Sequence, residues 1–154
     1  MDILFDAAWG RFSYRVAGLA VREGRLLVQR AQGDPCLSVP GGHVAFGETG
    51  AQTLRREFRE ELGLEIEVGP LAAVGEVFFR WNGPCQQIGL YYTVNFPGEP
   101  WEGLRYSLDS PEKVGFLWVP VEKIQRGEVE FCPAKLAEHL GKPGVAHFVD
   151  NQLK

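Results

Sequence analysis

Three glutamates, Glu57, Glu60 and Glu61, are the residues whose spacing most directly suggests chemistry. Glu57 and Glu61 are four residues apart and Glu60 is three from Glu57, so on a helix all three project toward one side. Like charges at this spacing cost an isolated helix roughly 0.2–0.5 kcal/mol per pair, and their crowding raises the pKa values of the acids. A cation bound among them would remove this penalty.

Carboxylate oxygens grouped in this way suit Mg²⁺ or Mn²⁺, and Mg²⁺ usually completes its shell with water and substrate phosphate oxygens. The acids therefore indicate phosphate chemistry. Gly41 and Gly42 let the backbone approach closely enough for the Gly41 carbonyl to reach the metal. Arg56 lies among the acids and could hold carboxylates in place by bidentate pairing.

The ordinary alternative is a solvated helix face on which the acids form weak ion pairs with Arg55, Arg56 and Arg59. That interpretation would be preferred for an isolated Glu-Glu pair. The surrounding sequence argues against it, because the acids belong to a longer pattern. The pattern is Gly42-x5-Glu48-x7-Arg56-Glu57-Phe58-x-Glu60-Glu61-x-Gly63-Leu64.

This segment resembles the signature of the Nudix hydrolases, Gx5Ex7REUxEExGU, in which U is a bulky apolar residue. Every fixed position is met, and Phe58 at a usually aliphatic position is a mild departure. Seven specified residues at ordinary usage would arise by chance in such a chain with a likelihood on the order of 10⁻⁷ or less. The resemblance is close over 42–64 and looser over the preceding hairpin and the apolar run 115–119.

The resemblance implies an α/β fold, an α/β/α sandwich around a mixed β-sheet. It also implies hydrolysis of a nucleoside diphosphate linked to another group, with Mg²⁺ or Mn²⁺ as cofactor. The implied reaction is substitution at phosphorus by a metal-activated water. Substrates in keeping with the family are a nucleoside triphosphate, including an oxidised one, a nucleotide sugar, ADP-ribose and a dinucleoside polyphosphate.

The roles of the family's residues carry over by position in the signature. Glu57 and Glu61 resemble the main metal ligands, with Glu60 as a further ligand or a base that orients water. The Gly41 carbonyl is a further implied ligand. Two more positions complete the implied catalytic set: Glu48, which resembles a helper acid near the metal, and Arg56, which resembles the arginine that orients Glu57.

The general base stays open, because in this family it comes either from the signature or from a later loop. The later region here, 97–113, holds four acids: Glu99, Glu102, Asp109 and Glu112. Two functional alternatives also stay open. One is a Nudix-fold module that binds a nucleotide to regulate a partner without turnover, and the other is a metal-dependent isomerase related by fold. The intact acids favour the hydrolase.

Three residues are candidates for substrate binding: Arg30, His43 and Trp81. His43 could touch phosphate or metal, although a lone histidine beside a turn is more often structural. Trp81 could stack on a base, although aromatic residues in strands mostly belong to the core. Arg30 is a candidate for phosphate contact on its charge alone.

A helix must position the acids. The sequence predicts this helix and also where it begins and ends. Thr49-x-x-Gln52 has the form of a capping box, and Gly63 follows the last residue of helical character. Apolar residues recur at helical spacing between these ends and predict the face that lies on a sheet. They are Ala51, Leu54, Phe58 and Leu62.

Strands and turns surround this helix. A β-hairpin is predicted from 14–21 and 25–29. Short extended pieces at 37–40 and 43–46 are predicted to be separated by a turn at Pro40-Gly41-Gly42. Further strands are expected at 65–68, 74–81, 88–96 and 115–119, with short helices at 120–125 and 133–140. Region 97–113 is predicted to be a long surface loop.

Length and charge limit the remaining possibilities. A chain of 154 residues with 45% hydrophobic content suits a single domain, 1–154, with one substantial core. The formal charge of −4 has the wrong sign for a protein that neutralises many phosphates, so polymeric nucleic acid is not an expected partner. A small nucleotide needs only a metal and a few local cations. Members of the resembled family often form homodimers, which makes a homodimer one expected assembly.

Cysteines and the chain start bear on location. Cys36, Cys85 and Cys132 are odd in number and far apart, without a CxxC pair or a dense disulfide framework, so a reducing compartment is expected. The opening residues lack the basic start and apolar run of a secretory signal. The uncharged stretch 81–98 is broken by polar residues and is not expected to span a membrane. We therefore expect a cytoplasmic protein.

Overall fold

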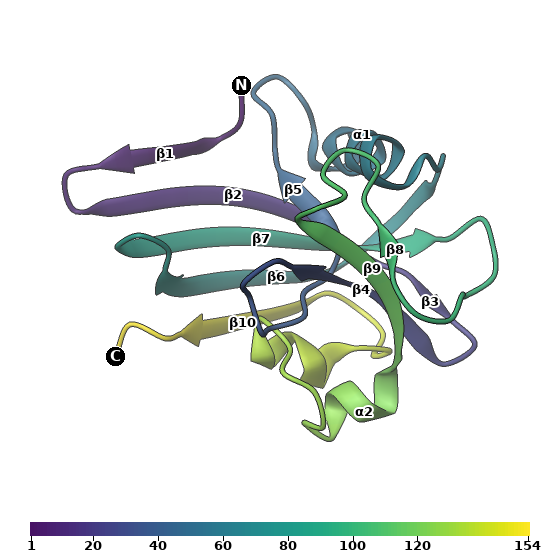
Figure 1. The fold of residues 1–154 in the computed structure, drawn as a ribbon. Helices are drawn as coiled ribbons and strands as arrows, with labels where there is room; N and C mark the ends of the chain where they lie inside the picture. The colour runs from purple at the N-terminus through teal and green to yellow at the C-terminus, as the bar shows by residue number, and fades with distance from the viewer.

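A six-stranded mixed sheet lies at the centre of the computed structural model, which describes all residues 1–154 (Figure 1). Strands β2 and β7 are parallel, β7 and β6 are antiparallel, and β6 and β10 are parallel again. In spatial order the strands are β1 (Leu4–Ala7), β2 (Gly10–Leu19), β7 (Pro84–Asn95), β6 (Glu67–Arg80) and β10 (Ala146–Asn151), with β5 (Gly41–His43) paired to β2.

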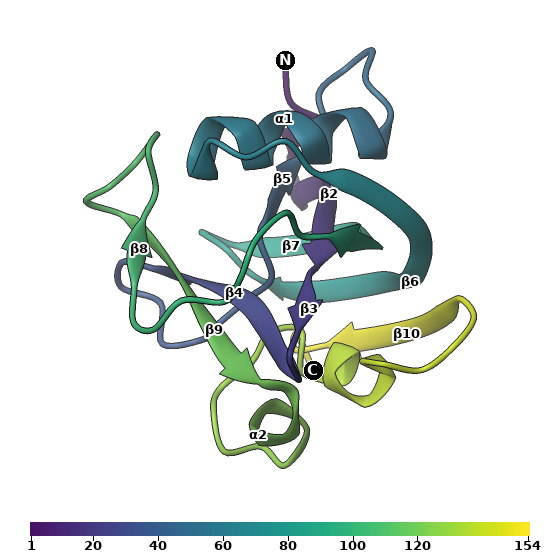
Figure 2. The same ribbon diagram turned by 90° about the vertical axis from the view of Figure 1, so that its right-hand side faces the viewer.

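A second, antiparallel sheet of four strands crosses the first (Figure 2). Its strands in spatial order are β3 (Val21–Arg22), β4 (Arg25–Ala31), β9 (Val114–Pro120) and β8 (Arg105–Tyr106). Helix α1 (Gly50–Leu62) covers one face of the mixed sheet, while α2 (Val121–Gln125) and the 3₁₀ helix η1 (Ala134–His139) lie at the other side. The predicted α/β class with a mixed sheet between helices is confirmed.

Helix α1 is held on the sheet by its apolar face. Leu54 and Phe58 are almost completely buried, and each such side chain contributes about 1.5–3 kcal/mol through removal from water. Gly18 of β2 makes this close packing possible, because a Cβ built there would lie 2.6 Å from Val94 and 3.3 Å from Phe58. The predicted stripe is therefore the packing face, with its buried residues at the centre.

Both predicted ends of α1 are confirmed. The Thr49 hydroxyl accepts from the Gln52 amide at 3.2 Å, and the Gln52 side chain accepts from the Thr49 amide at 2.8 Å. These two bonds satisfy amides that the first turn leaves free. Gly63 ends the helix with φ 68°, a left-handed conformation that glycine adopts without steric cost.

Three predicted local structures are wrong in their boundaries. The hairpin at 14–29 is split, because β2 ends at Leu19 and β3, which pairs with β4, belongs to the other sheet. The strands predicted at 65–68 and 74–81 form one strand, β6, whose register shifts near Pro70 absorb the proline. Gly41 and Gly42 lie in β5 rather than in a turn. The backbones of β5 and β2 come so close there that a Cβ on Gly41 would overlap the Val16 carbonyl.

Three strands were not predicted, namely β1, β8 and β10. β8 lies within the predicted loop 97–113 and pairs with β9. β10 was missed because a parallel edge strand takes its partner, β6, from a distant part of the chain. No helix in the structure combines the length and the apolar character needed to cross a membrane.

One pair of cysteines is bonded, although the sequence shows no disulfide framework. Cys36 and Cys132 form a disulfide with a Cα–Cα separation of 5.9 Å, while Cys85 is buried and free. The bonded pair is 96 residues apart in sequence, so spacing alone gives no signal for it. Disulfides are uncommon in reducing compartments, and the cysteines therefore no longer support that part of the location argument.

The disulfide leads to a thiol count that can be measured directly. Protein unfolded in denaturant without reductant should expose one reactive thiol, that of Cys85, and three after reduction. The double variant Cys36→Ser/Cys132→Ser should lose up to about 4–5 kcal/mol of unfolding free energy, because the bridge closes a long loop. Its stability should no longer respond to reductant. Three thiols in the unreduced protein would contradict the pairing.

Candidate active site

Helix α1 places its acids against strand β5. Glu57 lies so close to Gly42 that a Cβ built on this glycine would be 2.6 Å from the Glu57 carboxyl carbon. The Glu57 side chain is 19% exposed. The Gly41 carbonyl belongs to the peptide bond that leads into Gly42. Glycine at 42 is thus required by contact with the helix rather than by a turn.

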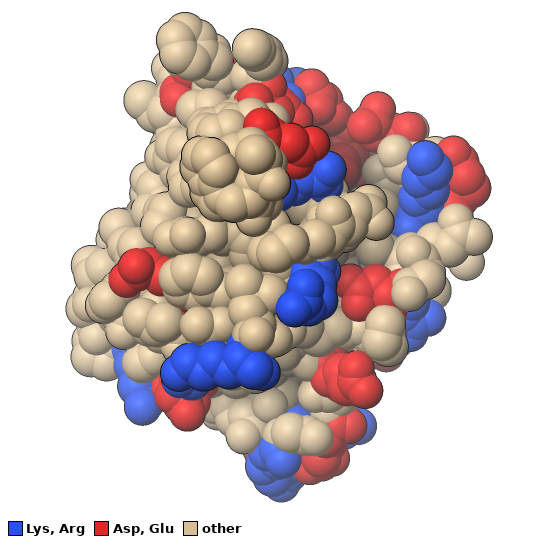
Figure 3. All heavy atoms as spheres, turned by 90° about the vertical axis from the view of Figure 1, so that its left-hand side faces the viewer, with Lys and Arg blue, Asp and Glu red and all other residues tan.

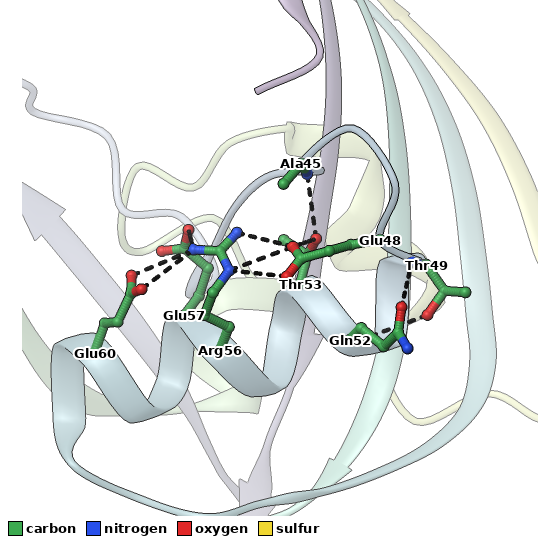
Figure 4. Close-up of polar contacts among 8 residues, drawn as sticks. All are labelled: Ala45, Glu48, Thr49, Gln52, Thr53, Arg56, Glu57 and Glu60. Carbon is green, nitrogen blue, oxygen red and sulfur yellow. Dashed lines mark hydrogen bonds and ion pairs between the residues drawn. The ribbon is translucent and has the colours of Figure 1, made fainter. Parts of the chain in front are cut away.

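Arg56 joins three of the signature acids (Figure 4). Its Nη2 lies 3.1 Å from Oε1 of Glu48, and its Nε donates to the same carboxylate. Nη1 lies 3.3 Å from Glu57 Oε1 and 3.3 Å from Glu60 Oε2. The Thr53 hydroxyl donates to Glu48 at 2.7 Å. Arg56 therefore grips Glu48 with two nitrogens and only touches Glu57, the residue that it was expected to orient.

These contacts and the burial of the side chains shift the pKa values of the acids in different directions. The Arg56 guanidinium, followed by the Thr53 hydroxyl, lowers the pKa of Glu48. Burial raises the pKa of Glu57, and Arg56 only partly opposes this effect. Burial, followed by repulsion from Glu57 and Asp109, raises the pKa of Glu61 to about 7. Glu57 and Glu61 are thus less favourable as anions than ordinary glutamates, and a cation among them would offset this cost.

The donor set fits a hard divalent cation. Glu57 and Glu61 lie on one helix in a partly buried place where their carboxylates lack full compensation, and carboxylate oxygens are the ligands that such a cation takes. No three acidic, histidine or cysteine side chains already surround a common point in the structure. Arg56 holds Glu60, and Glu57 and Glu61 repel each other, which accounts for this separation. Side-chain rotation is therefore required to form a metal site.

A cavity of about 640 Å³ opens beside β5. Arg15 of β2 forms part of its wall, is mostly buried, and donates from Nη2 to the Val39 carbonyl at 2.8 Å. Burial lowers the pKa of Arg15, while the charges of Glu61 and Glu57 oppose that effect. This arginine therefore links the cavity electrostatically to the acids. A larger hollow of about 750 Å³ between α2 and η1 contains no signature residue in its lining.

Sequence reasoning missed Arg15. The signal was present, because an arginine interrupts the apolar strand at 14–21, where a charged residue needs a specific partner or function. Its importance was hidden because sheet pairing, not sequence spacing, places it between the cavity and the acids. Tyr91 and Gln87 of β7 also line the cavity and were not predicted as site residues.

The three predicted substrate-binding residues fall into two places. His43 and Trp81 both line the cavity, with ring centroids 5.8 Å apart and planes 10° from parallel. The Arg11 guanidinium lies 4.5 Å from the Trp81 ring, so Trp81 already has aromatic and cationic neighbours. Burial, aided by the Arg15 charge, lowers the pKa of His43. An unprotonated imidazole is therefore favoured in the cavity wall.

Arg30 is not brought to this cavity. It is exposed on β4, where strand alternation directs it away from its neighbour Gln29, which lines the cavity. Arg30 instead borders a separate hollow of about 220 Å³ together with Glu112 and Lys113. The structure therefore gives no support to Arg30 as a substrate contact within the cavity.

Of the acids in region 97–113, only Asp109 acts by its charge on a residue of the signature. The Leu108 amide donates to the Glu61 carbonyl at 2.8 Å, which docks this region on the end of α1 and brings the charge of Asp109 to bear on Glu61. Glu99 and Glu102 instead pair with arginines on the second sheet at 3.0 Å. Among the four acids of this region, Asp109 is therefore the one whose charge acts on a signature residue.

Comparisons with known proteins identify relatives of this chain. The family model of the NUDIX domain matches residues 12–140. The chain is 41% identical over 133 residues to a MutT-like protein of Streptomyces ambofaciens, covering 86% of this chain and 79% of that protein. It is 32% identical over 120 residues to the 8-oxo-dGTP diphosphatase of Haemophilus influenzae, covering 74% and 79%.

Solved structures show the same fold. The crystal structure of a MutT NUDIX hydrolase from Burkholderia pseudomallei superposes with a TM-score of 0.62 at 23% sequence identity. The match covers 84% of this chain and 98% of the other. The mixed sheet and its helices are therefore a shared architecture.

The raised pKa of Glu61 gives a pH-dependent stability. Because the folded-state pKa is about 7 and the ordinary value is 4.5, the folded protein holds this proton more tightly than the unfolded chain. The resulting stabilisation is full below about pH 4.5 and is lost as pH rises through 7. In EDTA at pH 8, Glu61→Gln should be more stable than wild type by about 1–2 kcal/mol, a value discounted for partial exposure.

Urea unfolding in EDTA at pH 5 and pH 8 measures this difference. The advantage of Glu61→Gln should shrink markedly at pH 5, where the wild-type carboxyl is largely protonated. Glu65→Gln is the matched control, since Glu65 is exposed and Arg59 lowers its pKa. Equal advantages of Glu61→Gln at both pH values would show that charge burial is not the cause.

Proposed function

This chain belongs to the Nudix family of pyrophosphohydrolases, and we propose that it cleaves a diphosphate linkage of a nucleoside triphosphate in a metal-dependent reaction. The observation that carries the proposal is the pair of poorly compensated acids, Glu57 and Glu61, linked through Arg15 to a cavity of about 640 Å³. A cavity of this size holds a ligand on the scale of a nucleoside.

The choice of a triphosphate rests on the relatives. The two sequences at 32% and 41% identity are named as an 8-oxo-dGTP diphosphatase and a MutT-like protein. An oxidised purine nucleoside triphosphate is therefore the first substrate to test. Nucleotide sugars and ADP-ribose rank lower, because a UDP-X diphosphatase and an ADP-ribose pyrophosphatase are similar structures at 15% and 14% identity, which share the fold alone. Dinucleoside polyphosphates also rank lower, because they occur in neither relative's name.

We assign metal binding to Glu57, Glu60, Glu61 and the Gly41 carbonyl. The metal, Mg²⁺ or Mn²⁺, would activate water and neutralise charge on the phosphate oxygens. Arg56 keeps Glu48 fixed through two nitrogens, so Glu57 and Glu60 can turn toward a cation without releasing the whole network. Glu48 then supplies negative charge next to the ligands, supported by Thr53.

Arg15, His43 and Trp81 are assigned to the substrate. Arg15 has guanidinium N–H groups beyond the one bound to Val39, and these suit an oxygen of the substrate. His43 and Trp81 offer a flat wall for a base. Within the proposal, the 1–154 chain acts as one domain on a small nucleotide in the cytoplasm, with a homodimer as one assembly.

Surface charge agrees with a small substrate. On the face shown in Figure 3, Lys and Arg side chains are scattered and stand among acidic and uncharged ones. A protein that tracks a nucleic-acid backbone groups its cations along a stripe or groove. This face has no such grouping, in keeping with the formal charge of −4.

Turnover of a nucleotide panel tests the proposed function. Wild type, Glu57→Gln and Glu61→Gln are compared with 8-oxo-dGTP, the four common triphosphates, ADP-ribose and a nucleotide sugar, with and without Mg²⁺ or Mn²⁺. Turnover should require metal and fall at least about a hundredfold in each variant, because each loses an anionic ligand. Glu65→Gln should retain activity. Saturable binding without turnover of any compound would instead indicate a nucleotide-binding module.

Asp109 is the loop acid to test as general base. Asp109→Asn should lower kcat by about 100- to 10,000-fold with little change in KM if its carboxylate takes the proton from water. It should also remove the acidic limb of the pH profile of kcat. Glu102→Gln is the control, because Glu102 pairs with Arg25 away from the signature. Full activity of Asp109→Asn would return the role to the signature glutamates.

A further inference from the structure

The cavity wall includes a loop that follows β4, residues 33–36, which we call the wall loop. Asp34 lines the cavity of about 640 Å³, and so do Cys132 and Pro133 from a distant part of the chain. Residues 33–35 are exposed and Cys36 is half-buried. Packing in the core therefore does not fix this part of the wall, and its position depends on the bonds that it forms.

The hydrogen bonds of the wall loop are all local. The Asp34 amide donates to the Ala31 carbonyl at 3.1 Å, and the Cys36 amide donates to Asp34 Oδ1 at 2.9 Å. The disulfide from Cys36 to Cys132 is thus the only bond that joins the loop to a segment distant in sequence. It also holds Cys36, whose amide orients the Asp34 carboxylate.

At its other end the disulfide is attached to a segment that is fixed independently. The Leu37 amide donates to the Glu130 carbonyl at 2.9 Å, and the Cys132 amide donates to the Leu37 carbonyl at 2.8 Å. Phe131 is 6% exposed and belongs to a core cluster. Breaking the disulfide would therefore leave Cys132 in place and release the wall loop alone.

The disulfide can be reached from outside the cavity. Cys36 lines the hollow of about 750 Å³ between α2 and η1, whereas Cys132 lines the cavity, so the bridge lies between the two. Both residues are half-buried. Thiol–disulfide exchange needs access to one sulfur of the bridge. Cys85, which is 1% exposed, has no comparable access.

Such a bridge is unusual in the compartment proposed for this chain. Disulfides of cytosolic proteins are mostly transient and act in catalysis or in redox sensing. The two cysteines are 96 residues apart and do not form the CxxC motif of disulfide oxidoreductases. A sensing role fits a partly exposed bridge whose loss releases one loop.

We propose that the Cys36–Cys132 disulfide is a redox switch that controls ligand binding in the cavity. A dithiol supplies the reducing equivalents: one of its thiolates attacks a sulfur of the bridge, a mixed disulfide forms, and the second thiolate resolves it. The dithiol leaves as a disulfide, and the two cysteines gain two electrons and two protons as thiols. This inference rests on the proposed nucleotide hydrolysis, whose substrate it takes as the ligand of the cavity.

Reduction is expected to weaken binding rather than chemistry. A loop that moves freely before binding must be ordered when the ligand arrives, and this ordering lowers the affinity. The wall loop forms no hydrogen bond with α1, so Glu57 and Glu61 keep their surroundings. The values of KM and Kd should therefore rise in the reduced protein, while kcat should change less than about twofold.

Calorimetric binding of 8-oxo-dGMP tests the switch without turnover, because this probe has no diphosphate linkage. Oxidised wild type, wild type in excess dithiothreitol and Cys36→Ser/Cys132→Ser are compared. The last two should bind about three- to tenfold more weakly than oxidised wild type. The double variant should not respond to dithiothreitol. Cys85→Ser is the control and should respond as wild type does, because Cys85 lies outside the bridge.

NMR order parameters of backbone amides test the tether without any nucleotide. On reduction of wild type, the values for Asp34 and Cys36 should fall from about 0.85, typical of rigid backbone, to below about 0.6. The values in α1 should stay unchanged. Unchanged values in the wall loop would overturn the inference. A loss of order throughout α1 would also overturn it, because the bridge would then maintain the whole fold rather than one wall.

The nucleotide measurements separate this inference from the proposed function. Equal Kd values for oxidised and reduced wild type would overturn the switch and leave the hydrolysis standing. A fall in kcat at constant KM would do the same, because it would place the effect in the chemical step. If neither form binds 8-oxo-dGMP or any triphosphate of the panel, both proposals are overturned.

Discussion

The close contact between helix α1 and strand β5 is the constraint on which the rest of the site depends. Gly18 lets Phe58 and Leu54 sink into the sheet, and this depth presses Glu57 against Gly42. A shallower helix would leave the acids in water, where their mutual repulsion would be screened and their pKa values ordinary. Apolar packing on one side of the helix thus provides the energy that holds charged groups in a partly buried place on the other.

Two arginines flank these acids and have different effects. Arg56 lies on the same helix and neutralises Glu48 most strongly, which leaves Glu57 and Glu61 with less compensation. Arg15 approaches from β2 on the cavity side, where burial leaves it short of partners. The acids and the cavity are therefore coupled by charge across β5. Acids and an arginine that lack full compensation within the protein are typical of a ligand-binding site.

Local features of this chain could be predicted from its sequence. The capping box at Thr49, the left-handed Gly63 and the apolar stripe depend on neighbours within one helix, so α1 was predicted almost to the residue. Features that depend on pairing were missed or wrong. Gly41-Gly42 resembles a turn until β2 lies beside it, and β10 has no signal of its own because its partner is far away in sequence. The disulfide between Cys36 and Cys132 was missed for the same reason.

The sequence by itself determined the helix that carries Glu57, Glu60 and Glu61 and the chemistry that such acids imply, because both follow from spacing within about two turns. The tertiary structure decided which other groups meet them: Arg15 and not Arg30, and Asp109 among the loop acids. It also decided that Tyr91 and Asp150 are buried without partners. These outcomes depend on sheet register and on the docking of a distant loop, which are fixed by the packing of the whole chain and not by any short segment.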